Sequence, residues 1–182
     1  MNTDTIIAIT AIAAIIISVI SMVFTVVFSI QQMKHNKNSV RPICDIKIND
    51  YENLISVAIA NFGTGPLIIK KIICKDAERT SQTLLSLMPH INQLWTTFTE
   101  DVTGWTIPVD GKIVLIELHP DNDNDKYRVR SALEKTTIEV TYTDIYGSAN
   151  FEKSRKLDFF GRTLGMNNRH YDSNYSGETK VF

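Results

Sequence analysis

The chain has few of the residues that define several common protein classes. Its 182 residues include only two cysteines, eight glycines and five prolines. Two cysteines exclude a disulfide-rich secreted scaffold and a four-cysteine zinc site. So little glycine and proline excludes a fibrous or low-complexity chain. The net charge of -1, from 19 basic and 20 acidic residues, argues against a strongly basic nucleic-acid binder. The length predicts one domain, with or without an appendage.

Charge is almost absent from the first thirty residues. An uncharged run extends from Thr5 to Ile30, and Asp4 is the only charged side chain before it. As a helix, these residues would be about 39 Å long, whereas about 20 apolar residues suffice to cross a bilayer. A cleavable signal peptide has a basic start and a shorter apolar stretch. We therefore predict an uncleaved single transmembrane α-helix, with its juxtamembrane extension, over residues 1–38.

Basic residues follow this run and do not precede it. They are Lys34, Lys37 and Arg41. Because basic flanks stay in the cytoplasm, the chain is expected to cross the bacterial inner membrane once, with its N-terminus outside and its C-terminal domain cytoplasmic. Cys44 and Cys74 then lie in a reducing compartment, where each is predicted to be a small buried strand residue.

A stripe of small and polar residues runs along the predicted helix. It consists of Thr10, Ala14, Ser18, Ser21, Thr25, Ser29 and Gln32. Spacings of three and four residues keep this polar stripe on one helix face. Two interpretations remain open. The hydroxyls could bond to the carbonyls of their own helix, or the stripe could be a helix-packing or pore-lining surface in an oligomeric bundle. A lumen lined by hydroxyls would be weakly selective, because it has no charged ring.

Residues 43–160 are predicted to form a mainly-β domain. Apolar and polar residues alternate from Cys44 to Ile48, as in a half-buried strand. Further strands are expected at 54–61, 67–74, 113–118, 137–145 and 150–156, and short helices at 81–88 and 127–135. About seven short strands favour an immunoglobulin-like β-sandwich with one or two short helices. Residues 92–107 are ambiguous, and residues 161–182 form a polar C-terminal tail that is either disordered or laid over a neighbouring subunit.

Motifs that would carry catalysis or metal binding are incomplete. Gly63-Thr64-Gly65-Pro66 lacks the spacing and the lysine of a phosphate-binding loop, so we expect a hairpin connection there. Asp121, Asp123 and Asp125 match the start of a calcium loop, but Lys126 and Ala132 replace its glycine and glutamate. A solvated loop that caps the next helix is the better interpretation. We predict no catalytic residue, no metal ligand and no cofactor.

Nucleic-acid binding and nuclease activity have weak support. Without Asp4, the part after the uncharged run has 19 basic and 19 acidic residues, so it carries no strong nucleic-acid footprint. Lys70, Lys71 and Lys75 could bind a phosphate, although a solvated edge strand explains them more simply. No histidine follows an arginine at the spacing that a HEPN ribonuclease requires.

The order of these features resembles a known family. An uncharged N-terminal helix, a basic break that ends at Arg41-Pro42, a small β domain and a polar tail are similar to the small membrane accessory protein of type VI-B CRISPR-Cas systems. The segment that supports the likeness runs from Asn61-Phe62-Gly63-Thr64-Gly65-Pro66 through Ile68, Ile69, Lys70 and Lys71. The resemblance implies a ring-shaped homo-oligomer, with an octamer as one candidate size. It also implies a non-enzymatic pore that depolarises or permeabilises the inner membrane when the RNA-guided RNase of the system acts.

Two functions therefore remain open at the level of sequence. In the first, the chain is an oligomeric pore and accessory effector in antiviral defence, with itself and the lipid bilayer as partners. In the second, it is a monomeric, membrane-anchored binding or scaffold module whose β-sandwich recognises a nucleotide or a protein.

Overall fold

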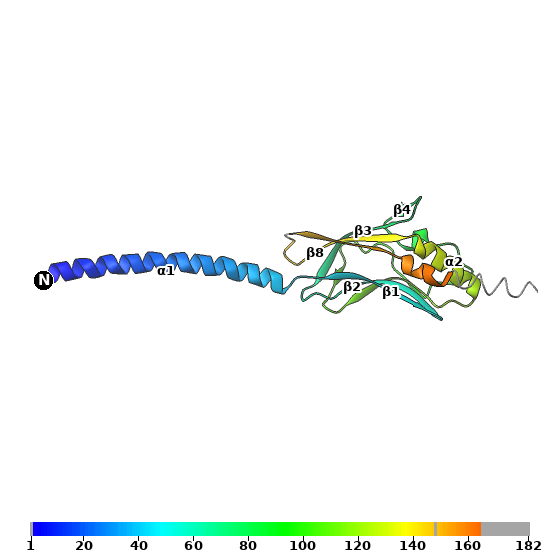
Figure 1. Ribbon diagram of the computed structural model, residues 1–182, viewed down its shortest axis with the longest axis horizontal. Helices are drawn as coiled ribbons and strands as arrows, with labels where there is room; N and C mark the ends of the chain where they lie inside the picture. The colour runs from blue at the N-terminus through cyan, green and yellow to red at the C-terminus, as the bar shows by residue number, and fades with distance from the viewer. Residues whose placement is uncertain (1, 148, 165–182) are drawn as a thin grey trace, which may run out of the picture. The chain divides into compact units, whose positions relative to one another are not determined.

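A computed structural model describes residues 2–147 and 149–164 of the chain (Figure 1). The chain divides into two compact units, Met1–Val40 and Arg41–Phe182. The elements are α1 (Thr3–Ser39), β1 (Cys44–Tyr51), β2 (Leu54–Asn61), β3 (Leu67–Lys75), β4 (Thr80–Ser81), η1 (Leu85–Leu87), β5 (Thr97–Phe98), β6 (Thr106–Ile107), β7 (Lys112–Leu118), α2 (Asp123–Glu134), β8 (Thr137–Thr143), β9 (Asn150–Lys156) and η2 (Asp158–Thr163).

The first unit is the single helix α1. It has 37 residues, none of them buried, and its uncharged part is long and apolar enough to cross a membrane. A helix of this kind near the N-terminus fits a membrane span or a signal sequence. It ends at Ser39, three residues before Pro42, in agreement with the tendency of proline to end helices just upstream.

The second unit is mainly β and contains two antiparallel sheets, so the predicted combination of a long apolar helix and a β-rich part is confirmed. One sheet has the order β1-β2-β7-β5, and the other has the order β4-β3-β8-β9, with β6 paired to β3. Their buried apolar side chains form one core. Strands β2 and β9 have the predicted bounds. The β1–β2 register pairs Cys44 with Asn61 and Tyr51 with Leu54, which leaves Glu52 and Asn53 as the turn.

Four local expectations need correction. Residues 62–66 do not close a hairpin, because β2 and β3 belong to different sheets. The helix expected at 81–88 is a short 3-10 turn, η1, after strand β4. Helix α2 begins four residues earlier than expected, at Asp123. Residues 161–163 belong to η2 rather than to a free tail, and residues 165–182 lie outside the described part of the chain.

Helix α2 and η2 pack against the core between the ends of the two sheets (Figure 1). Val129 and Leu133, one helical turn apart, are both fully buried, and Phe160 of η2 is equally buried. The helix begins at Asn122, whose side-chain oxygen accepts a hydrogen bond of 2.8 Å from the backbone N–H of Asp125. This cap satisfies one of the free N–H groups of the first turn. A helix cap is therefore found as expected, but it is Asn122, because residues 123–125 belong to α2 and Asp125 is buried rather than solvated.

Candidate functional site

The polar stripe lies entirely on α1, and all seven residues are exposed in the single chain. At about 100° of rotation per residue they fall within an arc of about 100°. Helix α1 contains no glycine or proline between Thr5 and Ile30, so close approach to another helix depends on the alanine and serine residues of this arc.

The hydroxyls of the stripe divide into two groups. Thr10, Ser18 and Thr25 donate to backbone carbonyls one turn earlier, at 2.8–3.0 Å. This is the local bonding that one interpretation of the stripe expects. Within the described residues, the side chains of Ser21 and Ser29 make no hydrogen bond, and neither does that of Gln32. These three keep donors for water or for another helix.

The three basic residues that follow the apolar run belong to different units. Lys34 and Lys37 lie on α1, whereas Arg41 begins the β unit. The guanidinium of Arg41 stands 4.9 Å from the centre of the Phe151 ring. The backbone carbonyl of Arg41 accepts a hydrogen bond of 3.1 Å from Thr64. The structure therefore gives Arg41 contacts within the β unit that the sequence did not predict.

One fully buried amide, that of Asn61, joins three loops at one end of the β unit. Asn61 Oδ1 accepts from the N–H groups of Gly63 at 2.9 Å and Ile43 at 3.3 Å. Its Nδ2 donates to the carbonyls of Gly65, Ile107 and Pro108 at 2.8–3.2 Å. Residues 41–43, 62–66, 104–111 and 144–147 meet here, because the starts of β1, β3 and β7 pair with the ends of β2, β6 and β8. We call this the Asn61 end.

Gly63 explains the glycine in the motif quoted from the sequence. A Cβ atom at this position would lie 2.4 Å from the carbonyl oxygen of Arg41 and 2.4 Å from the backbone N of Ile43. No other residue fits without moving that segment. The motif is thus a structural junction of the Asn61 end, where the chain crosses from one sheet to the other.

A buried ion cluster holds the opposite end, which we call the Asp50 end. The side chain of Asp50 is fully buried and receives the Nε of Arg130 at 2.7 Å. Arg162 donates to the backbone carbonyl of Asp50 at 3.1 Å and lies 3.6 Å from its Oδ2. The cluster ties the β1–β2 turn to α2 and η2. This structural clamp sets one carboxylate against two guanidinium groups, and within the described residues Asp50 Oδ2 makes no hydrogen bond.

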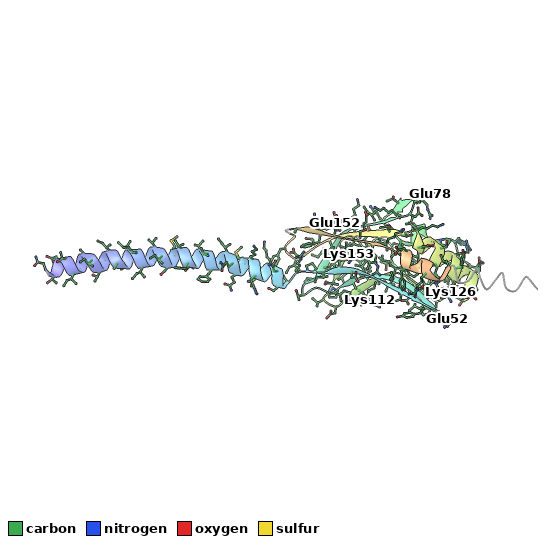
Figure 2. All side chains as sticks on the ribbon, in the orientation of Figure 1. Glu52, Glu78, Lys112, Lys126, Glu152 and Lys153 are labelled. Atoms are coloured by element: carbon green, nitrogen blue, oxygen red, sulfur yellow. The ribbon has the colours of Figure 1, made fainter. Side chains whose placement is uncertain are left out.

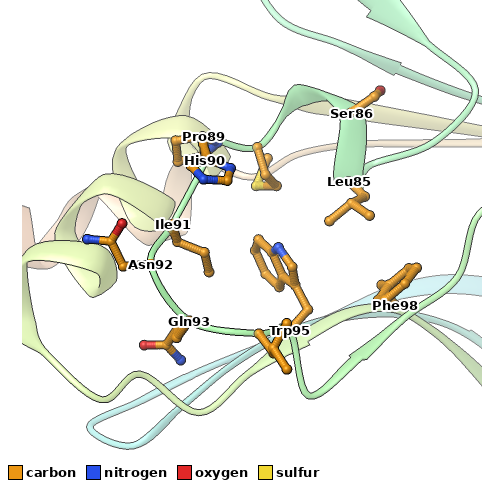
Figure 3. Close-up of a pocket in the computed structure, with 11 residues that line it drawn as sticks. Leu85, Ser86, Pro89, His90, Ile91, Asn92, Gln93, Trp95 and Phe98 are labelled. Carbon is orange, nitrogen blue, oxygen red and sulfur yellow. The ribbon is translucent and has the colours of Figure 1, made fainter.

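An apolar groove lies beside the Asp50 end. Its volume is about 910 Å³. It is lined by residues 85–98, including Leu85, Met88, Ile91, Leu94, Trp95 and Phe98. Figure 3 shows the Trp95 indole in the middle of the groove, with Ile91 on one side and Leu85 and Phe98 on the other. Leu94 is 91% exposed. The groove could accept an apolar side chain of a partner.

The other groups singled out in the sequence lie apart. Lys75 forms an ion pair with Glu139, while Lys70 and Lys71 are exposed because a bulge interrupts β3 between Ile69 and Lys71. On the side of β3 away from β8, strand β6 pairs with Leu67 and Ile68 and strand β4 pairs with Cys74 and Lys75, so the middle of that side is an edge. Among residues 2–147 and 149–164, no three histidine, cysteine or acidic side chains are placed to hold a metal ion.

The two cysteines are buried in strands, as predicted. Cys44 of β1 is 3% exposed and Cys74 of β3 is fully buried, and both are free thiols. Burial raises the pKa of each thiol to about 12, and the nearby carboxylate of Asp45 contributes for Cys44. Both are therefore unreactive thiols in the folded state.

Residues 6–161 match the model of a family described as "Domain of unknown function (DUF8453)". The chain belongs to this family, and the match includes both α1 and the β unit. No curated protein and no solved structure matches the chain.

Proposed function

We propose that this member of the family is a non-enzymatic, single-pass inner-membrane protein that assembles into a homo-oligomeric pore. In this proposal α1 spans the membrane with its N-terminus outside, the β unit is cytoplasmic, and the polar stripe mediates helix packing or lines the lumen. The observation that carries the proposal is the position of the seven stripe residues within one narrow arc of an otherwise apolar helix.

The length and flanks of α1 support a span. The uncharged run would be about 39 Å long, enough for a hydrocarbon core of about 30 Å. Lys34 and Lys37 follow it within the same helix. The family model begins inside the apolar run and continues through the β unit, which favours a helix that stays attached over a signal sequence that is removed.

The unsatisfied donors of the stripe support association. In hydrocarbon, a hydroxyl or amide without a partner is costly. Among the described residues the side chains of Ser21 and Ser29 have no hydrogen-bond partner, so a lone span would leave these two hydroxyls facing lipid. A second copy of α1 or a water-filled lumen would satisfy them. One span cannot enclose a channel, so a pore requires several copies.

The strand orders support an immunoglobulin-like sandwich as the β unit. In immunoglobulin domains one sheet has the order A-B-E-D and the other contains C-F-G. Chain order assigns A, B, D and E to β1, β2, β5 and β7, whose sheet has the order β1-β2-β7-β5. It assigns C, F and G to β3, β8 and β9, which are neighbours in the second sheet. Such a rigid unit would act as the collar that sets the number of subunits.

The role in defence follows from the resemblance to the type VI-B CRISPR-Cas accessory protein. A pore that opens when the RNA-guided RNase acts would depolarise the membrane of an infected cell. The test replaces Ser18, Ser21 and Thr25 together by leucine. Insertion should be retained, while entry of a membrane-impermeant dye into infected cells that carry the RNase should be lost.

A matched control carries the same number of leucines on the opposite face. Ile15, Val19 and Val26 lie about 140–180° from Thr10 around the helix, and their replacement by leucine should leave dye entry intact. Dye entry that persists in the stripe variant at normal protein levels would contradict the role of the stripe.

The alternative function is a monomeric anchored binding or scaffold module. The groove around Trp95 favours it, because an open apolar groove with a highly exposed Leu94 is a common docking feature. This alternative predicts that α1 can be exchanged for an unrelated span without loss of activity, and that Leu94→Ser abolishes it. The pore proposal predicts that exchanging α1 for an unrelated span abolishes activity.

A further inference from the structure

A second cavity of the β unit lies beside α2. Its volume is about 330 Å³, and its lining combines α2 with Pro89 and with the turn at residues 76–79, between β3 and β4. The helix and its C-cap contribute Tyr127, Arg128, Ser131, Ala132 and Lys135, and the turn contributes Asp76 and Arg79. Because Arg79, Arg128 and Lys135 are basic, we call this cavity the basic pocket.

The acid of the basic pocket holds one of its arginines in place. Asp76 Oδ2 accepts from the Nε and Nη2 of Arg79 at 3.0 and 2.7 Å, and the same Nη2 donates to the carbonyl of Leu87 at 3.0 Å. Asp76 Oδ1 accepts from the backbone N–H groups of Glu78 and Arg79, and these hydrogen bonds hold the pKa of Asp76 below its usual value. Asp76 is therefore ionised at neutral pH and fixes the guanidinium group of Arg79.

The other two basic residues of the pocket have no acid bonded to them. Within the described residues, the side chains of Arg128 and Lys135 make no hydrogen bond. Arg128 Nη1 lies 3.8 Å from Asp125 Oδ1, which is too far for a hydrogen bond. Glu78, the other acid of the turn, is exposed and does not line the pocket (Figure 2). The pocket therefore presents more positive charge and more donors than its own acid satisfies.

Many basic side chains elsewhere on the β unit do face an acid. The pairs are Lys75–Glu139, Lys126–Asp123 and Lys153–Asp45. Lys70 and Lys71 of β3 are exposed and have no such partner among the described residues, but they do not line the basic pocket. The pocket is thus a place where unpaired basic groups from two separate segments converge on one cavity.

We infer that the basic pocket binds the phosphoryl groups of a nucleotide. The oxygens of a phosphoryl group are acceptors with negative charge, which complements the two guanidinium groups and the ammonium group of the pocket. The ring of Tyr127, which is 37% exposed, supplies a flat surface for a base. A cavity of about 330 Å³ suits a small molecule. The inference goes beyond the proposed function and does not rest on it, because every residue of the pocket belongs to the β unit.

Isothermal titration calorimetry of the full chain in an uncharged detergent tests the inference, with ADP as the probe. We expect one ADP to bind per chain, with a dissociation constant below about 1 mM. Adenosine, which lacks the phosphoryl groups, should not bind. A chain that binds no ADP, or that binds adenosine as tightly as ADP, would overturn the inference.

Two further probes identify the source of the phosphoryl group. Inorganic phosphate carries the charge alone, and glycerol phosphate is the charged part of a phospholipid. Both should bind about tenfold more weakly than ADP, because neither has a base to stack on the ring of Tyr127. Glycerol phosphate that binds as tightly as ADP would assign the pocket to a lipid headgroup and would overturn binding of a nucleotide.

A pair of matched double variants locates the site. Arg128→Gln together with Lys135→Gln should lower the affinity for ADP by about tenfold or more, and the β unit should stay folded because both side chains are exposed. Lys70→Gln together with Lys71→Gln removes the same charge from β3. At about 0.15 M salt, where distant charges are screened, this control should bind ADP as the wild type does. Equal losses in the two double variants would reveal general charge attraction and would overturn the site.

A substitution of the ring separates the base from the phosphoryl groups. Tyr127→Leu should lower the affinity for ADP by about tenfold and leave the affinity for inorganic phosphate unchanged. Unchanged binding of phosphate also shows that the variant is folded. Unchanged binding of ADP by Tyr127→Leu would contradict the position given to the base.

Discussion

The two ends of the β unit are each held by one buried polar side chain, but the two side chains differ in charge. Asn61 is neutral and has five hydrogen bonds, all to backbone groups. Asp50 is an acid and needs the guanidinium groups of Arg130 and Arg162. A neutral hub satisfied by the backbone leaves no charge to be solvated. The Asn61 end therefore depends on backbone groups of neighbouring loops, whereas the Asp50 end depends on two arginine side chains of α2 and η2.

The largest effect is expected at the charged hub. Asp50→Ala leaves Arg130, whose side chain is only 10% exposed, without its acid. An unpaired buried charge of this kind lowers the free energy of unfolding by about 3–5 kcal/mol. Guanidinium unfolding of the full chain in mild detergent measures the loss. Asp123→Ala is the control, because Asp123 is 82% exposed and lies 3.9 Å from its lysine partner. Equal losses in the two variants would contradict the clamp.

The neutral hub should respond to pH once it is made an acid. Asn61→Asp places a buried carboxyl group beside three carbonyl oxygens, which raises its pKa in the folded state above the unfolded value of about 4. Relative to the wild type, the variant should lose little free energy of unfolding below about pH 4. The loss should grow to about 3 kcal/mol as the pH rises through the pKa that the new carboxyl group has in the folded state. Unfolding curves at several pH values measure it. Asn61→Ala should lower the free energy of unfolding by an amount that does not depend on pH. A loss of stability that is independent of pH in both variants would contradict the role given to Asn61.

The two ends also differ in what surrounds their glycines. Gly63→Ala meets backbone atoms of Arg41 and Ile43, which cannot rotate away, and should cost about 2 kcal/mol. In Gly161→Ala, near the Asp50 end, the three atoms nearest to the added methyl belong to the flexible side chain of Glu134, which can move. Thermal unfolding of the two variants should give a clearly lower midpoint for Gly63→Ala. The opposite order would mean that segment 41–43 is not fixed as described.

The smallest effect concerns the two thiols, one near each end. Because burial raises the thiol pKa to about 12 in the fold, stability attributable to them is fully present at neutral pH. It declines once the pH exceeds about 9, where unfolded thiols ionise. Maleimide labelling at pH 8 should therefore be slow for both. Asn61→Ala should accelerate Cys44 more than Cys74, since Cys44 pairs with Asn61. Equal acceleration would indicate global rather than local opening.

Much of the architecture was predictable from local pattern. The uncharged run predicted α1. Alternation of apolar and polar residues, or a continuous apolar run, predicted β2 and β9 with their observed bounds. Strands β5 and β6 could not be predicted, because two residues carry no periodicity and exist only through pairing with β7 and β3.

The two hubs were equally inaccessible to sequence reasoning. Asp50 and Arg130 are 80 residues apart, and nothing local marks them as partners. Asn61 was visible within a motif, but its role depends on distant backbone groups such as the carbonyl of Ile107, 46 residues later. The predicted interpretation of residues 62–66 as a hairpin was wrong, because alternation specifies a strand but not the sheet that it joins.

The mass of the full chain in mild detergent tests the central claim most directly. Light scattering corrected for bound detergent should give a single species of several 20.6 kDa subunits. The variant with leucine at Ser18, Ser21 and Thr25 should fall toward one subunit, and the control with leucine at Ile15, Val19 and Val26 should not. A wild-type mass of one subunit would contradict the pore.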